Sequence, residues 1–186
     1  MLTDSPPPEP WHSFLRELDS RLDEEVNLRC IGGFAFTVHY GVVRPTSDID
    51  FLSVFPRHLN ARLLKLAGRR SSLYKKHGVC LHLVNLGVVD LPRGYLDRVL
   101  EMFPSAYTWL HLSTLEPYDL ALSKLQRNGI HDRDDVKQLA LRVPLNSGTL
   151  RRRYEDNMRP YIDNAERKDL RIKLWIEMIN DVQGER

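Results

Sequence analysis

The spacing of hydrophobic residues predicts alternating helices and strands over residues 11–112. Phe14, Leu15, Leu18 and Leu22 fall on one stripe at helical spacing, which predicts an amphipathic helix over residues 11–25. Short apolar runs predict strands at residues 26–31, 48–55, 79–86 and 107–112. Two more helices are predicted between them, at residues 34–40, closed by Gly41, and at residues 57–67, with a basic loop after the second.

The pattern changes after residue 112, where only helical spacing continues. Four helices are predicted, at residues 116–126, 132–141, 147–158 and 162–182, with turn signals at Asn128-Gly129, Pro144 and Pro160. A mixed segment followed by a helical one predicts an α/β (α+β) fold, in which helices flank a small mixed sheet and a helical C-terminal domain follows. The expected divisions are a disordered, proline-rich lead-in over residues 1–10, a core over residues 11–112 and a helical domain over residues 113–186.

Composition narrows the class of protein. The hydrophobic fraction of 42% is that of an ordinary globular chain, and the net charge of +2 does not indicate a polycation built for nucleic acid. No apolar run approaches the roughly 18–20 residues of a membrane span, and the N-terminus has no signal-peptide pattern. We therefore expect a soluble, cytoplasmic protein without a membrane partner. The short basic clusters at residues 69–70, 75–76 and 151–153 are either solvated helix faces or nucleic-acid contacts.

Two cysteines, Cys30 and Cys80, lie within apolar, strand-like segments. Isolated cysteines in such segments behave as small hydrophobic residues, so both are predicted to be buried, reduced thiols rather than disulfide partners or metal ligands.

Two aspartates carry the strongest chemical signal. Residues i and i+2 of a strand point to the same face, so Asp48 and Asp50 are predicted to project together while Ile49 points into the core. Two carboxylates about 7 Å apart repel each other unless a cation lies between them. Mg²⁺ prefers carboxylate oxygens and keeps positions open for phosphate oxygens, so this pair predicts a magnesium site.

The Gly32-Gly33 pair supplies a second element, between a predicted strand and a predicted helix. Glycine lets the backbone approach a phosphate closely, and the following helix presents unpaired N–H groups at its start. Neither Gly-Gly nor Asp-x-Asp is specific alone. Their order, with strand, Gly-Gly, helix, loop and Asp-Ile-Asp on the next strand, is much more specific.

This order resembles the nucleotidyltransferase superfamily of the DNA polymerase β type over about residues 27–55. With Arg44 and Thr46 ahead of Asp48-Ile-Asp50, it most resembles bacterial proteins of the abortive-infection AbiEii class, the toxins of type IV toxin–antitoxin systems. The resemblance implies a nucleotidyltransferase core, a nucleoside triphosphate as substrate, an RNA acceptor such as tRNA, and a cognate antitoxin protein as partner.

A second region carries the same resemblance. Asp119 to Asn128 contains Lys124 and Arg127, and His131 to Val136 contains Asp135, as in the class's pattern of a lysine and an arginine on one helix before Arg-Asp-x-x-Asp. His131 stands where that class usually has arginine. On spacing alone, Lys124 emerges from an apolar helical stripe, where its ammonium requires a carboxylate, a phosphate or an escape to water.

Asp135 also has two interpretations. It is either a residue facing the site or the N3 acid of a helix capped by Asp132. The resemblance assigns Asp48, Asp50, Lys124 and Asp135 to catalysis, and Gly32, Gly33, Arg44, Thr46, Lys124 and Arg127 to nucleotide binding.

One departure separates this chain from the active members of the superfamily. They usually take a third carboxylate from a later core strand, but residues 79–87 contain no acid, and Asp90 lies beyond them. His82, on that strand, is either structural or a group that orients the acceptor.

Three functions follow. The first is Mg²⁺-dependent transfer of a nucleoside monophosphate to an acceptor hydroxyl, which makes the protein an enzyme. The second is transfer to a small molecule such as an antibiotic. The third is a non-catalytic, degenerate module that binds a nucleotide or a partner, which the missing third acid favours.

Overall fold

The computed structural model describes residues 5–54, 56–85 and 87–184, which form two compact units. The first unit comprises the described residues of segments 1–39, 43–85 and 100–114. The second comprises those of segments 40–42, 86–99 and 115–186. The domain boundaries at residues 10 and 112 stay a prediction.

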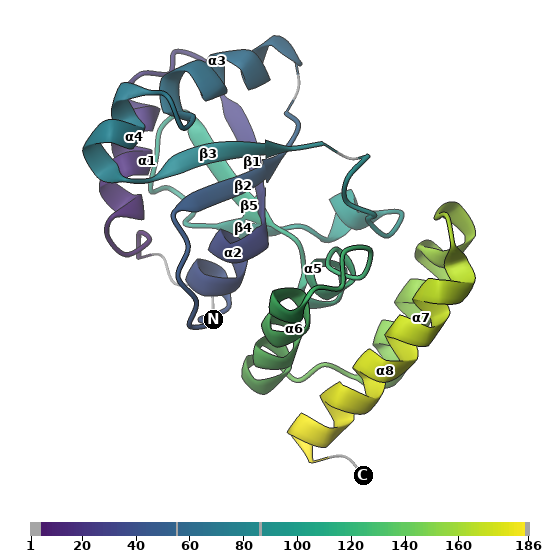
Figure 1. Cartoon of the computed structure of the whole chain (residues 1–186). Coiled ribbons are helices and arrows are strands. Elements are labelled where there is room, and N and C mark those ends of the chain that lie inside the picture. The colour runs from purple at the N-terminus through teal and green to yellow at the C-terminus, as the bar shows by residue number, and fades with distance from the viewer. Residues whose placement is uncertain (1–4, 55, 86, 185–186) are drawn as a thin grey trace. The chain divides into compact units, whose positions relative to one another are not determined.

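The first unit is built on a five-stranded mixed sheet in the order β3-β2-β1-β5-β4 (Figure 1). Strand β1 pairs in parallel with β5 and antiparallel with β2, while β2 and β3 are parallel and β4 and β5 antiparallel. The strands are β1 Val26–Ile31, β2 Asp48–Leu52, β3 Cys80–Val84, β4 Leu100–Met102 and β5 Leu110–Thr114. The strand predicted over residues 107–112 lies about three residues later, and β4 was not predicted. The ends predicted for the second and third strands, residues 55 and 86, lie outside the described residues.

Helices α1 Trp11–Asp19, α3 His58–Ala67 and α4 Ser72–His77 pack their apolar side chains into one core with alternate strand residues. Phe14, Leu15, Leu18 and Leu22 are all buried there, as the helical stripe predicts. Helix α1 ends at Asp19 rather than at residue 25. The Asp19 carboxylate accepts hydrogen bonds from the backbone N–H groups of Thr108, Trp109 and Leu110, which lead into β5.

The segment after Gly-Gly differs from its prediction. Helix α2 already begins at Gly32 and runs to Phe34, and Ala35–His39 continues as a π-helix. The predicted basic loop contains α4, whose first turn is capped by Ser71 Oγ, which accepts from Tyr74 N at 3.0 Å. Cys30 and Cys80 are buried, free thiols, as predicted.

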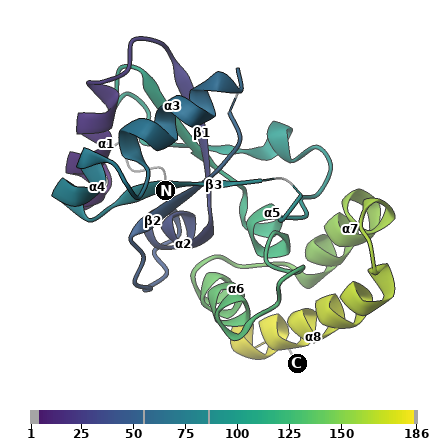
Figure 2. The same cartoon turned by 45° about the horizontal axis from the view of Figure 1, so that its top comes forward.

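The second unit is helical. Its helices are α5 Pro117–Leu122, α6 Ile130–Arg142, α7 Ser147–Asn157 and α8 Ala165–Gln183, with short 3₁₀ segments at Tyr95–Arg98 and Arg159–Tyr161. Helices α7 and α8 lie side by side in both views (Figures 1 and 2). Ile172, Trp175, Ile176 and Ile179 line the buried face of α8 at the spacing of one helical stripe.

These elements confirm the predicted fold class, with a small mixed sheet flanked by helices and helices at the C-terminus. Over the described part of the chain, every helix is too short or too polar to cross a bilayer.

Candidate functional site

Strand β2 presents Asp48 and Asp50 on one face of the sheet. Both residues are half-buried, whereas Ile49 between them is fully buried in the core. The predicted alternation is therefore confirmed. The face opposite the helix-covered core carries two carboxylates from consecutive outward positions.

Gly32 allows α2 to begin directly against Asp50. Its φ is +65°, a left-handed backbone conformation that is unfavourable for residues other than glycine. A Cβ at this position would lie 2.1 Å from Asp50 Oδ2, far inside van der Waals contact. Any larger residue at position 32 would displace the Asp50 carboxylate.

Gly33 makes a similar approach to the loop before β2. A Cβ there would lie 3.0 Å from Thr46 Oγ1 and 3.7 Å from Arg44 Cζ. Thr46 Oγ1 in turn donates to the backbone oxygen of Asp48 at 3.2 Å. The structure thus brings together all six predicted site residues of the first unit: Gly32, Gly33, Arg44, Thr46, Asp48 and Asp50.

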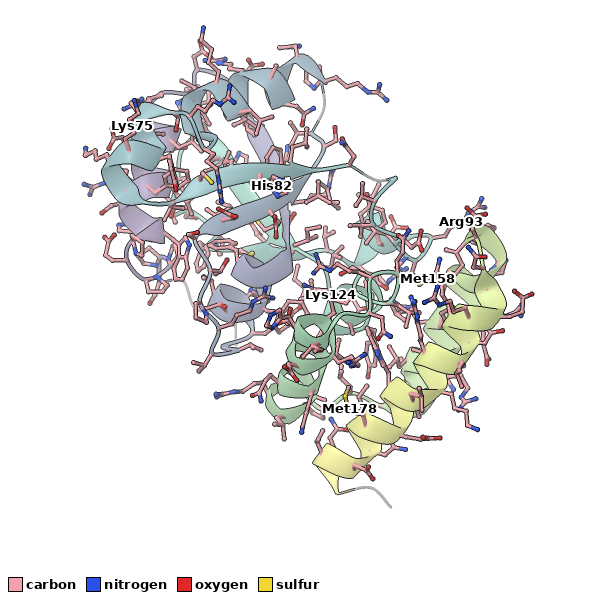
Figure 3. All side chains as sticks on the ribbon, in the orientation of Figure 1. Lys75, His82, Arg93, Lys124, Met158 and Met178 are labelled. Carbon is pink, nitrogen blue, oxygen red and sulfur yellow. The ribbon has the colours of Figure 1, made fainter. Side chains whose placement is uncertain are left out.

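Three side chains that the sequence did not place against the aspartates contact them. In the register of β2 and β3, Asp50 lies opposite His82 and Asp48 opposite Cys80. His82 Nδ1, on β3 in Figure 3, lies 2.8 Å from Asp50 Oδ1. The Cys80 thiol donates to Asp48 Oδ1 at 3.1 Å, and Arg69 Nη2 lies 3.4 Å from Asp48 Oδ2. The contacts of His82 and Cys80 depend on strand pairing, which hydrophobic spacing does not reveal.

The Cys80 thiol stays protonated at neutral pH. Burial and the neighbouring Asp48 carboxylate raise its pKa to about 11, since both disfavour a thiolate. It acts as a neutral hydrogen-bond donor to Asp48.

Across the described ranges, no group of three or more histidine, cysteine, aspartate and glutamate side chains is arranged to hold a metal ion. Asp90 belongs to the second unit, where it accepts from Lys168 Nζ at 2.7 Å.

Lys124 and Asp135 meet in the second unit. Helix α5 ends at Leu122, so Lys124 lies in the turn after it and not on the predicted helix over residues 116–126. The Lys124 side chain, labelled in Figure 3, is 7% exposed, with its Nζ 3.0 Å from Asp135 Oδ2 and 3.6 Å from Asp132 Oδ1. The sequence left a carboxylate, a phosphate or water as partners for this ammonium, and the structure shows a carboxylate partner.

The capping interpretation of α6 needs correction. The helix begins at Ile130, two residues before the predicted start, so Asp132 is its N3 residue and accepts from the backbone N–H of Gly129 at 2.9 Å. Asp135 lies one turn further along and points to Lys124. Arg127 binds Asp132 with Nε 2.8 Å from Oδ2. Burial alone would raise the pKa of Asp132, but the hydrogen bonds from Arg127 and Gly129 and the charge of Lys124 hold it below its usual value.

A buried ion network in the same unit was not predicted. Asp119 is completely buried and receives Arg98 Nε at 2.9 Å and Arg153 Nη1 at 2.6 Å, and Arg153 also binds Glu116 at 2.7 Å. Of the 151–153 cluster, Arg153 therefore binds the buried carboxylate of Asp119, whereas Arg151 and Arg152 are exposed.

Comparison with known families identifies the class of protein. Residues 12–183, nearly the whole chain, match the family model described as nucleotidyltransferase of unknown function (DUF6036). The chain belongs to this family. The search of curated proteins and the search of solved structures each gave no significant match.

Membership confirms the predicted nucleotidyltransferase superfamily and assigns nucleotidyl transfer as the class of activity, with a nucleotide as the class of substrate. The closer likeness to the AbiEii class stays a prediction. So do the roles of the individual site residues, which lie in two groups within this nucleotidyltransferase. Gly32, Gly33, Arg44, Thr46, Asp48 and Asp50 belong to the first unit, and Lys124, Arg127 and Asp135 to the second.

Proposed function

We propose that this protein transfers a nucleoside monophosphate from a nucleoside triphosphate to an acceptor hydroxyl, with Mg²⁺ held by Asp48 and Asp50. One observation carries the proposal. The two carboxylates share a face of β2, and glycine at position 32 leaves room for the Asp50 carboxylate at the start of α2. Mg²⁺ usually takes one or two protein carboxylates together with substrate phosphate oxygens, so this donor set suits the ion.

The site residues of the first unit bind either the metal or the triphosphate in this proposal. Asp48 and Asp50 hold the metal, and when bound Mg²⁺ offsets charge on the triphosphate oxygens. The backbone N–H groups at Gly32-Gly33 bind the β- and γ-phosphates, because glycine lets the backbone approach a phosphate closely. Arg44 and Thr46, which border Gly33, bind the remaining phosphate oxygens.

The reaction exchanges a phosphoanhydride bond for a phosphoester bond. The acceptor oxygen forms a bond to the α-phosphorus, the bond from that phosphorus to the bridging oxygen of the β-phosphate breaks, and pyrophosphate leaves. The acceptor proton passes to a base, for which Asp135 and His82 are the candidates. The resemblance to the AbiEii class assigns Lys124 and Arg127 to nucleotide binding as well.

The acceptor and the biological role rest on the resemblance to the AbiEii class. They are an RNA acceptor such as tRNA, a toxin-like activity and a cognate antitoxin protein. The exposed arginines Arg151 and Arg152 and the basic segment around Arg69 support a polyanionic acceptor more than a cationic antibiotic.

A non-catalytic nucleotide-binding module is the second candidate. It is favoured by one specific observation: within the part of the chain that the structure describes, no three-residue metal cluster surrounds Asp48 and Asp50. Such a module binds nucleotide with Mg²⁺ but forms no covalent product.

Incubation with each α-labelled nucleoside triphosphate, Mg²⁺ and total RNA tests the proposal. The expected result is label covalently attached to RNA by the wild-type protein and not by the variant Asp48→Asn with Asp50→Asn. Label on an added aminoglycoside instead would indicate the small-molecule acceptor. Mg²⁺-dependent binding of nucleotide without any labelled product would indicate the non-catalytic module.

A further inference from the structure

A polar cavity of about 260 Å³ lies within the second unit. Its lining comes from the loop that contains Asp90, from the turn after α5 and from the first turns of α8. Its charged side chains are Asp90, Asp163, Arg167, Lys168 and Arg171, with the Gln126 and Asn164 amides beside them. Three cations therefore face two carboxylates, which leaves the lining positive.

The positive charge is carried by the two arginines. Lys168 is 7% exposed and is neutralised by Asp90, whose Oδ2 lies 2.7 Å from its Nζ. Arg171 Nη1 donates to the backbone oxygens of Leu125 and Gln126 at 3.0 and 2.6 Å, which are uncharged acceptors. Among the described residues, neither Arg167 nor Arg171 forms an ion pair with a carboxylate.

Arg171 is oriented before any ligand arrives. The two backbone oxygens use one of its nitrogens and fix the plane of the guanidinium, which still has other N–H donors available. A planar guanidinium held in this way binds an oxyanion in a bidentate manner and loses little entropy in doing so. Arg167, on the exposed side of α8, supplies a second guanidinium at the same cavity.

We propose that this cavity binds a phosphate group of the acceptor. The inference rests on the proposed function and narrows it, because it requires an acceptor that carries phosphate, namely a nucleic acid. A polycationic acceptor such as an aminoglycoside meets the wrong sign of charge here. Phosphate oxygens bind between Arg167 and Arg171, with the Gln126 and Asn164 amides as additional donors.

The cavity borders the turn that contains Lys124, since Gln126 of that turn lines it. The oxygens held by Arg171 belong to Leu125 and Gln126, the two residues that directly follow Lys124. A phosphate bound at Arg171 is therefore connected through two hydrogen bonds to the turn that orients Lys124 toward Asp135.

Direct binding of RNA tests the inference without requiring catalysis. A fluorescently labelled single-stranded RNA of mixed sequence is titrated against the full chain over a series of salt concentrations. We expect Arg167→Ala to weaken binding about threefold to tenfold and to lower the slope of log K against log salt by about one, since one phosphate contact is lost. Arg142→Ala, which removes an exposed arginine at the end of α6, is the matched control and should leave both quantities unchanged.

A second variant is expected to change the RNA affinity in the opposite direction. Asp90→Asn keeps an oxygen that accepts from Lys168 but removes its charge, so the cavity becomes more positive and RNA should bind more tightly. Addition of inorganic phosphate should raise the melting temperature of Asp90→Asn more than that of wild type, because the bound anion replaces the lost carboxylate charge.

The source of the phosphate and the proposed function are tested separately. The variant Asp48→Asn with Asp50→Asn should bind the RNA as wild type does, because the cavity lies in the other unit. If Arg167→Ala weakens binding of a nucleoside triphosphate but not of RNA, the phosphate comes from the nucleotide and the acceptor assignment is wrong. Equal RNA affinity and equal salt slope for Arg167→Ala and Arg142→Ala would also overturn it.

Discussion

Lys124 Nζ lies 3.0 Å from Asp135 Oδ2, and the two side chains are only 7% and 4% exposed. One comes from the turn after α5 and the other from the second turn of α6, so the pair links two helices of the second unit. A buried ion pair contributes little over an apolar pair of the same size, but loss of one partner leaves an uncompensated charge in the interior. The first expected consequence of changing Lys124 is therefore a loss of stability.

Lys124→Ala should lower the free energy of unfolding by about 3–5 kcal/mol in the absence of nucleotide. Lys137→Ala, at an exposed position of α6, should stay within about 0.5 kcal/mol of wild type. Chemical denaturation measures both. In the double variant Lys124→Ala with Asp135→Asn, the loss of unfolding free energy should be smaller than the sum of the losses in the two single variants, since the residues interact directly. If the two losses simply add, the pair does not hold α6 to the turn.

Nucleotide binding by Lys124 gives a separate prediction. If its ammonium also contacts the triphosphate, as proposed above, Lys124→Ala should weaken nucleotide affinity by a further 1.5–3 kcal/mol or so. The measurement uses Mg²⁺ and nucleotide at a temperature where the variant is folded. Unchanged affinity would make Lys124 a purely structural residue.

Gly32→Ala and Gly41→Ala form a matched pair. Both glycines have a φ near +70° (+65° and +69°), so alanine at either position carries a backbone strain of about 1–2 kcal/mol. At Gly41 nothing lies within 4 Å of the added Cβ, whereas at Gly32 it meets Asp50 Oδ2 at 2.1 Å. Gly32→Ala should therefore cost about 1–3 kcal/mol more stability and should abolish Mg²⁺-dependent nucleotide binding.

Thermal melts and nucleotide titrations compare the two glycine variants. Gly41→Ala should bind nucleotide normally once its stability is taken into account. Equal effects on binding at the two positions would mean that Gly32 serves only the turn between β1 and α2.

His82→Ala and His82→Asn separate a positioning role from a proton-transfer role. Asn places its amide nitrogen close to the position of His82 Nδ1 and keeps a donor to Asp50 Oδ1, but it has no group that accepts a proton near neutral pH. If His82 positions Asp50, alanine should weaken Mg²⁺ binding by about 1 kcal/mol and asparagine should restore it. If His82 is the base, transfer activity should fall in both variants while Mg²⁺ affinity is retained in both.

Glu17 gives a prediction for pH dependence in the first unit. It lies on α1 and pairs with Arg21 and with Lys76 and His77, which are the last two residues of α4. The hydrogen bonds from Lys76 and His77, followed by that from Arg21, lower its pKa from 4.5 to about 2. A carboxylate whose pKa is lower in the folded state stabilises the fold above its unfolded pKa and loses this contribution as the pH falls through the folded pKa.

The stabilisation by Glu17 is therefore complete above about pH 5 and lost between pH 4.5 and 2. Melting temperatures of wild type and Glu17→Gln should differ most near neutral pH and converge toward pH 2. Glu25→Gln, an exposed change in the same unit, controls for the general effect of acid. A difference between wild type and Glu17→Gln that stays constant over this range would contradict the assignment.

Local patterns determined much of the first unit. The stripe of Phe14, Leu15 and Leu18 predicted α1, and the alternation of Asp48, Ile49 and Asp50 predicted which side chains of β2 are buried. Both features follow from the repeat of side-chain directions along a helix or a strand, which can be read from residues close together in the sequence. The order of Gly32-Gly33 and Asp-Ile-Asp likewise indicated the superfamily, which the family comparison confirms at the level of nucleotidyltransferases.

Contacts between distant segments were decided only by the tertiary structure. His82 and Cys80 meet Asp50 and Asp48 because β3 pairs with β2 in one particular register, and a shift by one residue would have put them on the other face. Helix α1 ends at Asp19, whose carboxylate binds backbone groups some ninety positions later in the chain. Arg153 appeared in the sequence as part of a basic cluster, yet the fold turns it inward to Asp119, a partner that no local spacing identifies. Sequence periodicity specifies the face on which a residue lies, but the partner that covers that face depends on how the whole chain packs.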